Sequence, residues 1–194
     1  LADCFGLRLL NRRGCFPQFD KFIEQTKDVW THLVDIRKSF EPRAEELARK
    51  YALAPYTMFI GSGALWGETI LFSMCILEEM QWKRTRYITS ADFFHGTLEL
   101  VEPGVPVFLF MGEDENRKLD ERVRAFLNRG VTGDTDINII DTAEFAIPGL
   151  DDEFRVIVSP WILSSLVTDR LAAYYETVTK HNLNYRRYYH QFDY

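Results

Sequence analysis

Apolar side chains in the first fifty residues follow a helical spacing. Gly14 and Pro17 interrupt the chain near its start, and Pro42 is expected just inside the beginning of a further short helix that ends near Tyr51. Between these breaks the apolar positions recur every three or four residues and so mark one face of a helix, at Phe19, Phe22, Ile23, Trp30, Leu33 and Val34. We therefore predict a helical segment over residues 1–52.

From residue 56 onward, short apolar runs rich in β-forming residues alternate with longer helical patterns. The predicted strands are 56–60, 86–89, 105–110 and 137–140, with a further candidate at 155–158, and the predicted helices are 64–81, 114–128 and 160–180. Strands that alternate with helices indicate a parallel sheet with helices on both faces. The predicted fold class is therefore α/β, a three-layer αβα doubly wound parallel sheet over residues 53–194, preceded by the helical segment.

Composition limits the classes of protein to which the chain can belong. Of its 194 residues 46% are hydrophobic, which is enough to build the core of one domain and excludes a mainly disordered chain. The net charge of −6 argues against a nucleic-acid partner, which requires a basic surface. No membrane span is expected, because the longest hydrophobic region, 65–77, is interrupted by polar residues and is shorter than the roughly 20 residues that a span requires.

Cysteine usage indicates a reducing compartment. Cys4, Cys15 and Cys75 are odd in number and have no metal-like spacing, so we expect neither a disulfide framework nor a metal site, and a cytoplasmic location. The chain begins with Leu1 and shows no signal peptide, which suggests a fragment or a processed product of a longer protein. An apolar face over residues 19–34 would be partly exposed in a single domain, so we expect a homodimer.

The loop Gly61-Ser62-Gly63 joins a predicted strand to a predicted helix. In a parallel sheet such a loop lies at the carboxyl edge, where small ligands usually bind. The free N–H groups of a helix N-terminus favour an anion such as a sugar phosphate, which makes Ser62 and Gly63 candidate substrate-binding residues. The alternative is that the glycines only allow a tight turn, because there is no third glycine and no phosphate-binding lysine.

Glu79 lies near the end of the predicted helix 64–81. Phe72, Cys75 and Ile76 precede it by seven, four and three residues, so all four should share one helix face. A carboxylate at the end of an apolar stripe is poorly solvated, which suits it to general acid–base work. Alternatively, the helix has frayed by this point and Glu79 reaches solvent, as Glu78 is expected to do.

His95 follows a predicted strand and precedes Gly96. Histidine is the side chain that titrates near neutral pH without perturbation, and the glycine would let the backbone turn sharply beside it. His95 is therefore a candidate acid or base, although most isolated histidines are structural or lie on the surface.

Aromatic residues crowd the segment 181–194, which should dock on the domain or on a second subunit. Arg186 or Arg187 of this segment could then hold a phosphate or carboxylate, or could simply pack and form a salt bridge.

One segment resembles a known family. The run 90–99, Ser-Ala-Asp-Phe-Phe-His-Gly-Thr-Leu-Glu, resembles the small–Glu–Phe–x–His–Gly–Pro motif of sugar isomerase (SIS) domains. Residues 101–106, the helix start at Asp114 and the tail Arg186–Tyr189 resemble one subgroup, the fructosamine 6-phosphate deglycases. In that subgroup a glutamate lies sixteen residues before the motif histidine, and Glu79 and His95 have this spacing. The resemblance implies that Glu79 and His95 are the catalytic residues.

The resemblance also carries an expectation about domains. Whole family members contain two SIS domains in tandem, which makes residues 1–52 an inter-domain helical segment and 53–194 the second, C-terminal SIS domain. The sequence departs from the motif at two positions, because Thr97 replaces the proline and Asp92 the glutamate. Gln191 stands where related aminotransferase enzymes use a lysine, which favours a deglycase over a glucosamine 6-phosphate synthase.

The implied activity is the conversion of a fructosamine 6-phosphate into glucose 6-phosphate and a free amino acid, without a metal or organic cofactor. Glu79 would move a proton between C1 and C2, and His95 would open the sugar ring or polarise its oxygen, reaching into a neighbouring subunit's site. Two alternatives remain: another phosphosugar isomerase or aminotransferase-type isomerase, and a regulatory module that binds a sugar phosphate without chemistry. The sequence does not identify the amino acid on the substrate, and the isolated chain could be inactive.

Overall fold

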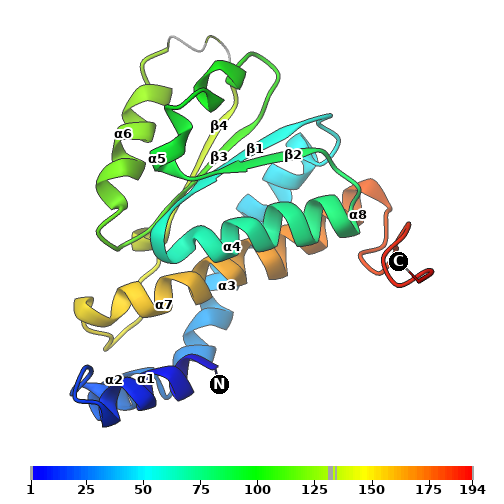
Figure 1. The fold of residues 1–194 in the computed structure, drawn as a ribbon. Helices are drawn as coiled ribbons and strands as arrows, with labels where there is room; N and C mark the ends of the chain where they lie inside the picture. Colours follow the sequence, from blue (N-terminus) through cyan, green and yellow to red (C-terminus); the bar gives the residue numbers. More distant parts are fainter. Residues whose placement is uncertain (1, 131–132, 134, 194) are drawn as a thin grey trace.

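A four-stranded parallel sheet lies between two layers of helices in the computed structural model, which describes residues 2–130, 133 and 135–193 (Figure 1). The strand order is β2-β1-β3-β4, with all neighbours parallel. The strands are β1 (Thr57–Gly61), β2 (Thr85–Ile88), β3 (Val107–Met111) and β4 (Ile137–Asp141). This arrangement confirms the predicted α/β fold class and four of the predicted strands.

Each face of the sheet is covered by its own helices, as Figure 1 shows. One layer contains α5 (Ser90–Phe93) and α6 (Arg117–Leu127). The other layer contains α3 (Val29–Tyr51), α4 (Trp66–Ile70), the π-helical η2 (Leu71–Met80), α7 (Asp152–Ser164), the π-helical η5 (Ser165–Leu171) and α8 (Ala172–Thr179). Short 3₁₀ helices lie between these elements at η1 (Gly63–Leu65), η3 (Thr97–Leu100) and η4 (Thr142–Glu144).

The two central strands, β1 and β3, are buried on both faces, as expected for a parallel sheet covered by helices, whereas the edge strands β2 and β4 are only partly buried. Phe59 and Phe108 face the core beneath α3, η2 and α7, whereas Ile60 and Leu109 face the core beneath α5 and α6. Because successive strand residues point to opposite faces, each strand contributes to both cores. The sheet therefore separates two hydrophobic cores, one on each of its faces.

The candidate strand at residues 155–158 is wrong, because these residues lie in α7. Phe154, Val158 and Ile162 are spaced four residues apart and are all buried, so the short β-branched run forms part of a helix face. The helix continues to Thr179 and is long and apolar enough to cross a membrane by length and composition alone. Half of its most apolar window is buried in the fold, as also occurs in the core helices of proteins without a membrane.

Pro42 lies inside α3 and does not start a new helix. A proline inside a helix removes one backbone hydrogen bond and costs about 3 kcal/mol. Phe40 and Ala44 on either side are buried against the domain, and this packing holds the helix together through the proline. The separate short helix expected up to Tyr51 is therefore wrong.

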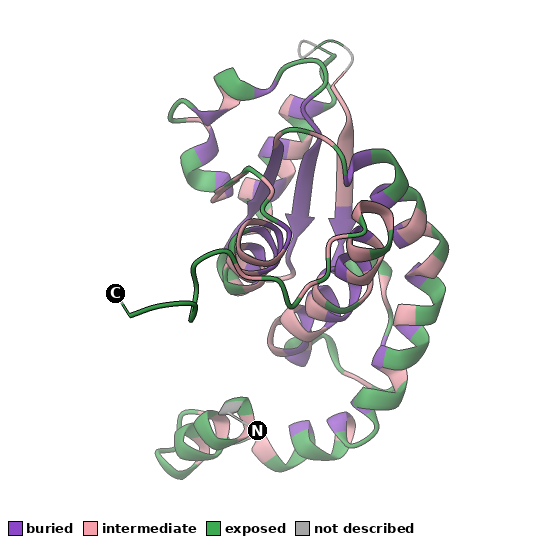
Figure 2. Ribbon diagram, turned by 90° about the vertical axis from the view of Figure 1, so that its right-hand side faces the viewer, coloured by how far each residue is buried: buried purple, intermediate pink, exposed green. Residues whose placement is uncertain are grey.

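The first helices extend from the domain as an arm, in which α1 (Ala2–Arg12) and α2 (Phe19–Thr26) lead into α3. Figure 2 shows that the outer part of the arm is largely exposed. Trp30 and Val34 are 65% and 43% exposed, so part of the expected apolar face is open. The helical character predicted for residues 1–52 is confirmed, while its role between two domains stays a prediction.

Candidate functional site

The loop after β1 lies at the carboxyl edge of the sheet, as predicted. Ser62 is buried, and its Oγ accepts a hydrogen bond from the N–H of Ser90 at 2.7 Å. Gly63 has a φ of +55°, and a Cβ at this position would lie 2.1 Å from an oxygen of Asp114. The loop therefore needs a glycine at position 63 both for its backbone conformation and for its close approach to Asp114.

A carboxylate of the chain itself occupies the place predicted for a phosphate. Asp114 accepts hydrogen bonds from the N–H of Ala64 at 2.5 Å and from its own neighbour Asn116 at 2.7 Å. The N–H group of Ala64, at the start of the helix, therefore already has an anionic hydrogen-bond partner. Asp114 would compete with a sugar phosphate for this N–H group, and the substrate-binding role of Ser62 and Gly63 stays a prediction.

The cavity beside this loop is acidic. Its volume is about 620 Å³, and none of its lining residues is basic. The lining includes five carboxylates, those of Glu113, Asp114, Glu115, Asp152 and Glu153. Phosphate is an anion, so the charge of this cavity, which we call the carboxyl-edge cavity, disfavours it.

Glu113 in this cavity belongs to a fixed network. It forms a two-pronged ion pair with Arg155, whose Nη2 lies 2.8 Å from Glu113 Oε1, and both side chains are only 13% exposed. Arg155 also donates to the carbonyl oxygens of Thr142 and Phe145. Because the partners of Arg155 are all internal, the network stabilises the fold around the cavity.

Asp120 is a buried carboxyl group at the same edge, and it was not among the residues predicted from the sequence. It accepts hydrogen bonds from Ser90 Oγ at 2.5 Å and from the N–H of Gly112 at 3.2 Å. Burial raises the pKa of Asp120 to about 6, although both hydrogen bonds act in the opposite direction. Asp120 precedes the buried Val123 and Leu127 by three and seven residues, and this helical spacing could have indicated that Asp120 lies on the buried face of the helix.

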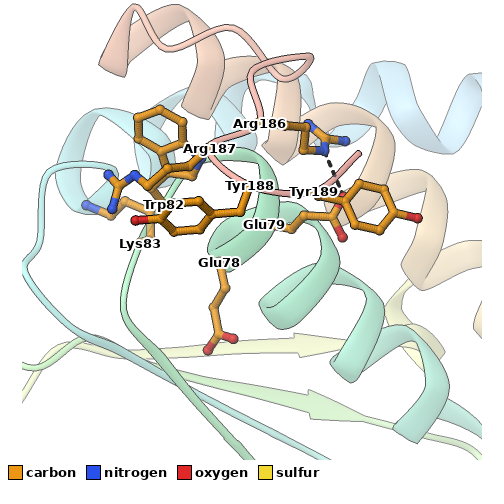
Figure 3. Close-up of a pocket in the computed structure, with 8 residues that line it drawn as sticks. All are labelled: Glu78, Glu79, Trp82, Lys83, Arg186, Arg187, Tyr188 and Tyr189. Atoms are coloured by element: carbon orange, nitrogen blue, oxygen red, sulfur yellow. Dashed lines mark ion pairs between the residues drawn. The ribbon is translucent and has the colours of Figure 1, made fainter. Parts of the chain in front are cut away.

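Glu79 lines a different cavity, of about 410 Å³, at the far end of η2 (Figure 3). One wall comes from the end of η2 and the residues after it, and the other comes from the C-terminal tail. The lining residues are Glu78, Glu79, Trp82, Lys83, Arg186, Arg187, Tyr188 and Tyr189. We call this space the tail cavity.

The carboxylate of Glu79 is paired but not enclosed. Its Oε1 lies 2.9 Å from Nε of Arg186, and the Glu79 side chain is 34% exposed. The π-helical turn of η2 alters the spacing that the sequence analysis assumed, so that Ser73 and Leu77 are buried while Cys75 is only half-buried. Cys75 lies near Glu79. Burial and the negative charge of Glu79 both raise the pKa of the Cys75 thiol. The poorly solvated Glu79 expected from the sequence is instead a partly exposed carboxylate beside an arginine.

The C-terminal tail contacts the domain through His181 and Arg187, although most of the aromatic side chains from which docking was predicted are exposed, with Tyr188 62% and Phe192 58% exposed. The ring of His181 packs edge-on against Trp82 with centroids 4.4 Å apart, and Gln81 Nε2 donates to the His181 carbonyl at 2.5 Å. The guanidinium of Arg187 lies 4.3 Å from the centre of the Trp82 ring. These contacts carry Arg186 and Arg187 to the mouth of the tail cavity.

Charge distinguishes the tail cavity from the carboxyl-edge cavity. Lys83, Arg186 and Arg187 provide three cationic groups against two carboxylates, in a chain that is acidic as a whole. Glu78 is turned away from the tail and accepts a hydrogen bond from Thr85 Oγ1 at 2.5 Å (Figure 3). The tail cavity is thus the more suitable of the two for an anionic ligand.

His95 lies in the opposite layer from Glu79. It follows α5, where Thr89 caps the short helix by accepting from the N–H of Asp92, and its side chain is exposed. Neighbouring Phe93 packs in the core beneath α5 and α6, whereas η2 packs on the other face of the sheet. The structure therefore does not bring Glu79 and His95 together within one chain, and their roles stay predictions.

No set of three or more histidine, cysteine, aspartate or glutamate side chains among the described residues could hold a metal ion. The free cysteines Cys4, Cys15 and Cys75 are distributed over α1, the turn after it and η2.

No protein-family model matches the chain. It is 28% identical over 188 residues to the fructosamine deglycase FrlB of Bacillus subtilis, an alignment that covers 95% of this chain and 54% of that protein. It is 30% identical over 194 residues to the fructoselysine 6-phosphate deglycase of Escherichia coli K12, covering 97% of this chain and 54% of the relative. The chain therefore spans about half the length of the curated relatives it matches.

Solved structures extend this likeness to the fold. A protein from Salmonella typhimurium described as a candidate phosphosugar isomerase has 26% identity and a TM-score of 0.86, over 97% of this chain and 57% of that one. A similarly described protein from Bacillus subtilis has 26% identity and a TM-score of 0.84, over 91% and 53%. The resemblance is therefore confirmed: the chain is similar in sequence to fructosamine and fructoselysine 6-phosphate deglycases and in fold to phosphosugar isomerases of the SIS type.

Proposed function

We propose that the natural protein containing this chain is a fructosamine 6-phosphate deglycase and that the tail cavity forms part of its active site. The observation that carries the proposal is the position of Glu79, a partly exposed carboxylate in a cavity whose other charged side chains are mainly cationic. A carboxylate can remove a proton from carbon, and cations beside it attract a phosphorylated substrate. The names of the sequence relatives support this substrate class.

The chemistry needs one base and one source of water. A fructosamine 6-phosphate carries its amine on C1 and a carbonyl at C2. Glu79 takes a proton from C1, the resulting enaminol is protonated at C2, and the product is an imine between C1 and nitrogen. Water adds to this imine and breaks the C1–N bond, which releases the amino acid and glucose 6-phosphate. One molecule of water is consumed, and neither oxidant nor metal takes part in this scheme.

His95 enters this scheme from a second subunit. Because Glu79 and His95 lie in opposite layers of one chain, one site can contain both only if two copies meet. The exposed side chain of His95 is available for such a contact, and the open apolar residues of the arm favour association. We therefore propose a homodimer or larger homo-oligomer, located in the cytoplasm, with active sites shared between subunits.

Mixing two inactive variants tests the shared site. Glu79→Gln removes the base, and His95→Ala is expected to cost at least about a hundredfold in turnover as loss of a general acid. If the site is shared, dimers reassembled from equal amounts of both variants contain some sites with both native residues, and up to about a quarter of the native activity returns. Absence of recovery, with mixed dimers verified by mass, would contradict the shared site, and a loss below threefold in His95→Ala would remove His95 from the mechanism.

Two other functions fit parts of the structure. The fold relatives described as phosphosugar isomerases support a second candidate, the isomerisation of a free sugar phosphate on the same scaffold. A regulatory module that binds a sugar phosphate is the third, and it has no need of a carboxylate beside the bound sugar. A coupled assay for glucose 6-phosphate, run with 6-phosphofructosyl-lysine, 6-phosphofructosyl-aspartate and free fructose 6-phosphate, separates the three.

The assay has a different expected result for each function. A deglycase releases glucose 6-phosphate from at least one fructosamine, an isomerase releases it from fructose 6-phosphate alone, and a binding module releases none. Comparing the natural protein with residues 1–194 shows whether this chain suffices. We expect turnover of a fructosamine by the natural protein; turnover of fructose 6-phosphate alone would contradict the proposed function.

A further inference from the structure

The cationic groups of the tail cavity differ in whether they already have an anionic partner. Arg186 is paired with Glu79 and also donates to the carbonyl oxygens of Leu183 and Tyr185. Arg187 forms no ion pair and donates no hydrogen bond to any residue that the structure describes, and its guanidinium lies over the Trp82 ring. Its guanidinium therefore retains all five of its donor N–H groups.

Lys83 reinforces this unpaired charge. Figure 3 shows Lys83, Trp82 and Arg187 gathered at one end of the tail cavity, while Glu79 and Arg186 occupy the other. The ammonium group of Lys83 donates to the carbonyl of Ala54 at 2.7 Å and has no carboxylate partner among the described residues. Burial lowers the pKa of Lys83. An anion bound beside the ammonium group would act in the opposite direction and stabilise its charged form.

We propose that Arg187, supported by Lys83, forms an anion-binding subsite that holds an oxyanion group of the substrate while its C1 lies at Glu79. A guanidinium fixed over an aromatic ring presents its edge to a carboxylate or phosphate in two parallel hydrogen bonds, and Trp82 restricts its orientation. A fructosamine 6-phosphate carries two such groups, the carboxylate of its amino-acid part and the 6-phosphate. The inference rests on the proposed function for the identity of this substrate.

The position of the subsite agrees with the rest of the molecule. The carboxyl-edge cavity is lined by five carboxylates and already holds Asp114 against its helix N-terminus, so it offers no cation to either group of the substrate. In the tail cavity the base and the unpaired cations lie at opposite ends of one space of about 410 Å³. A substrate whose reacting carbon and charged group are separated by a few bonds can therefore reach both.

Substrate analogues distinguish the two anionic groups. 6-Phosphofructosyl-glycine carries both a phosphate and a carboxylate, 6-phosphofructosyl-glycinamide lacks the carboxylate, and fructosyl-glycine lacks the phosphate. Binding of all three to the natural protein and to Arg187→Gln is measured by calorimetry, and kcat/KM is measured by release of the sugar product. If Arg187 holds the carboxylate, the substitution weakens 6-phosphofructosyl-glycine and fructosyl-glycine at least about tenfold and leaves the glycinamide unchanged.

If Arg187 holds the phosphate, the substitution instead weakens the binding of both phosphorylated compounds and leaves the binding of fructosyl-glycine unchanged. Arg187→Lys, which keeps the charge but not the fork of donors, is expected to recover part of the loss. The control is Arg8→Gln, because Arg8 is also an exposed arginine over an aromatic ring, that of Phe19, but lies on α1 outside both cavities. Its binding should match that of the unsubstituted protein.

Two results would overturn the subsite: a change of less than twofold for every compound in Arg187→Gln, or an equal loss for all three. Calorimetry does not depend on turnover, so failure of the subsite is distinguishable from failure of the proposed function. If no sugar product is released but the selective loss of binding is seen, the deglycase proposal fails and the anion subsite stands.

Discussion

Two glutamate–arginine pairs lie in two cavities of this molecule and are built differently. At the carboxyl-edge cavity, Glu113 and Arg155 are both 13% exposed, and Arg155 also bonds to two backbone carbonyls. At the tail cavity, Glu79 is 34% exposed and Arg186 18% exposed, and no other described residue bonds to the Glu79 carboxylate. The same two residue types thus form a closed structural network in one place and an open pair facing a cavity in the other.

The comparison shows why the position of a loop does not by itself identify a ligand site. The order β2-β1-β3-β4 reverses direction between β1 and β3, and in doubly wound sheets ligands bind outside the carboxyl ends of the strands at this point. In this chain Asp114 and the neighbouring carboxylates fill that place with negative charge. The cationic groups lie instead where the tail meets the end of η2.

The largest effect on stability is expected from Arg155→Met. Removal of the arginine leaves the carboxylate of Glu113 buried with Thr142 Oγ1 as its remaining partner, which costs about 4 kcal/mol of unfolding free energy. Arg186→Met should cost less than about 1 kcal/mol, because solvent reaches and screens the Glu79 carboxylate. Urea unfolding of the two variants measures the contrast, and equal losses would mean that the pairs do not differ as described.

Asp120 should make the stability of the carboxyl edge depend on pH. The raised pKa of about 6, against an ordinary value of 3.8, means that between these pH values the folded state keeps a proton that the unfolded state has lost. The unfolding free energy contributed by this group therefore falls as pH rises from about 4 to 6, by up to about 3 kcal/mol, and stays low above that range.

Asp120→Asn cannot ionise and is the matched variant for this effect. The difference in unfolding free energy between Asp120→Asn and the unsubstituted protein should shift in favour of the variant as pH rises from 4 to 7. A difference that is constant over this range would show that Asp120 does not titrate as its burial predicts.

A smaller loss is expected from Gly63→Ala. The left-handed backbone at φ +55° and a Cβ at 2.1 Å from the Asp114 carboxylate together should cost about 2 kcal/mol. Gly67→Ala is the control, because nothing lies within 4 Å of a Cβ there and alanine favours the helix, which should stabilise the protein by about 0.5 kcal/mol. Thermal unfolding compares them, and a Gly63→Ala variant as stable as Gly67→Ala would refute the close approach of Asp114.

Much of the fold follows from periodicity in the sequence. The four strands are short apolar runs bounded by turns or helices, so their alternation with helices was sufficient to predict the parallel sheet. The strand predicted at residues 155–158 was wrong because three consecutive β-branched residues, 156–158, fit a strand and a buried helix segment equally well. The helix start predicted at Pro42 was wrong because burial of the neighbouring residues outweighs the tendency of proline to interrupt a helix.

The site was less predictable because its parts are far apart in the sequence. The family motif and the spacing of Glu79 and His95 could be read directly, but the contact between Arg186 and Glu79 joins residues more than a hundred positions apart. Nor does local sequence show that Asp114 reaches back to the start of a helix fifty residues earlier. Such pairings depend on the topology of the sheet, which brings loops and tail together only after folding.

The most direct test of the account compares one carboxylate from each cavity in the natural protein that contains this chain. Glu79→Gln keeps the shape of the side chain but removes the base, and Asp114→Asn keeps an acceptor oxygen at the helix start. With 6-phosphofructosyl-lysine or 6-phosphofructosyl-aspartate, we expect Glu79→Gln to lower the release of glucose 6-phosphate about a thousandfold and Asp114→Asn to leave it within about fivefold. Near-normal turnover by Glu79→Gln, or a larger loss in Asp114→Asn than in Glu79→Gln, would contradict the assignment of the tail cavity as the site of the reaction.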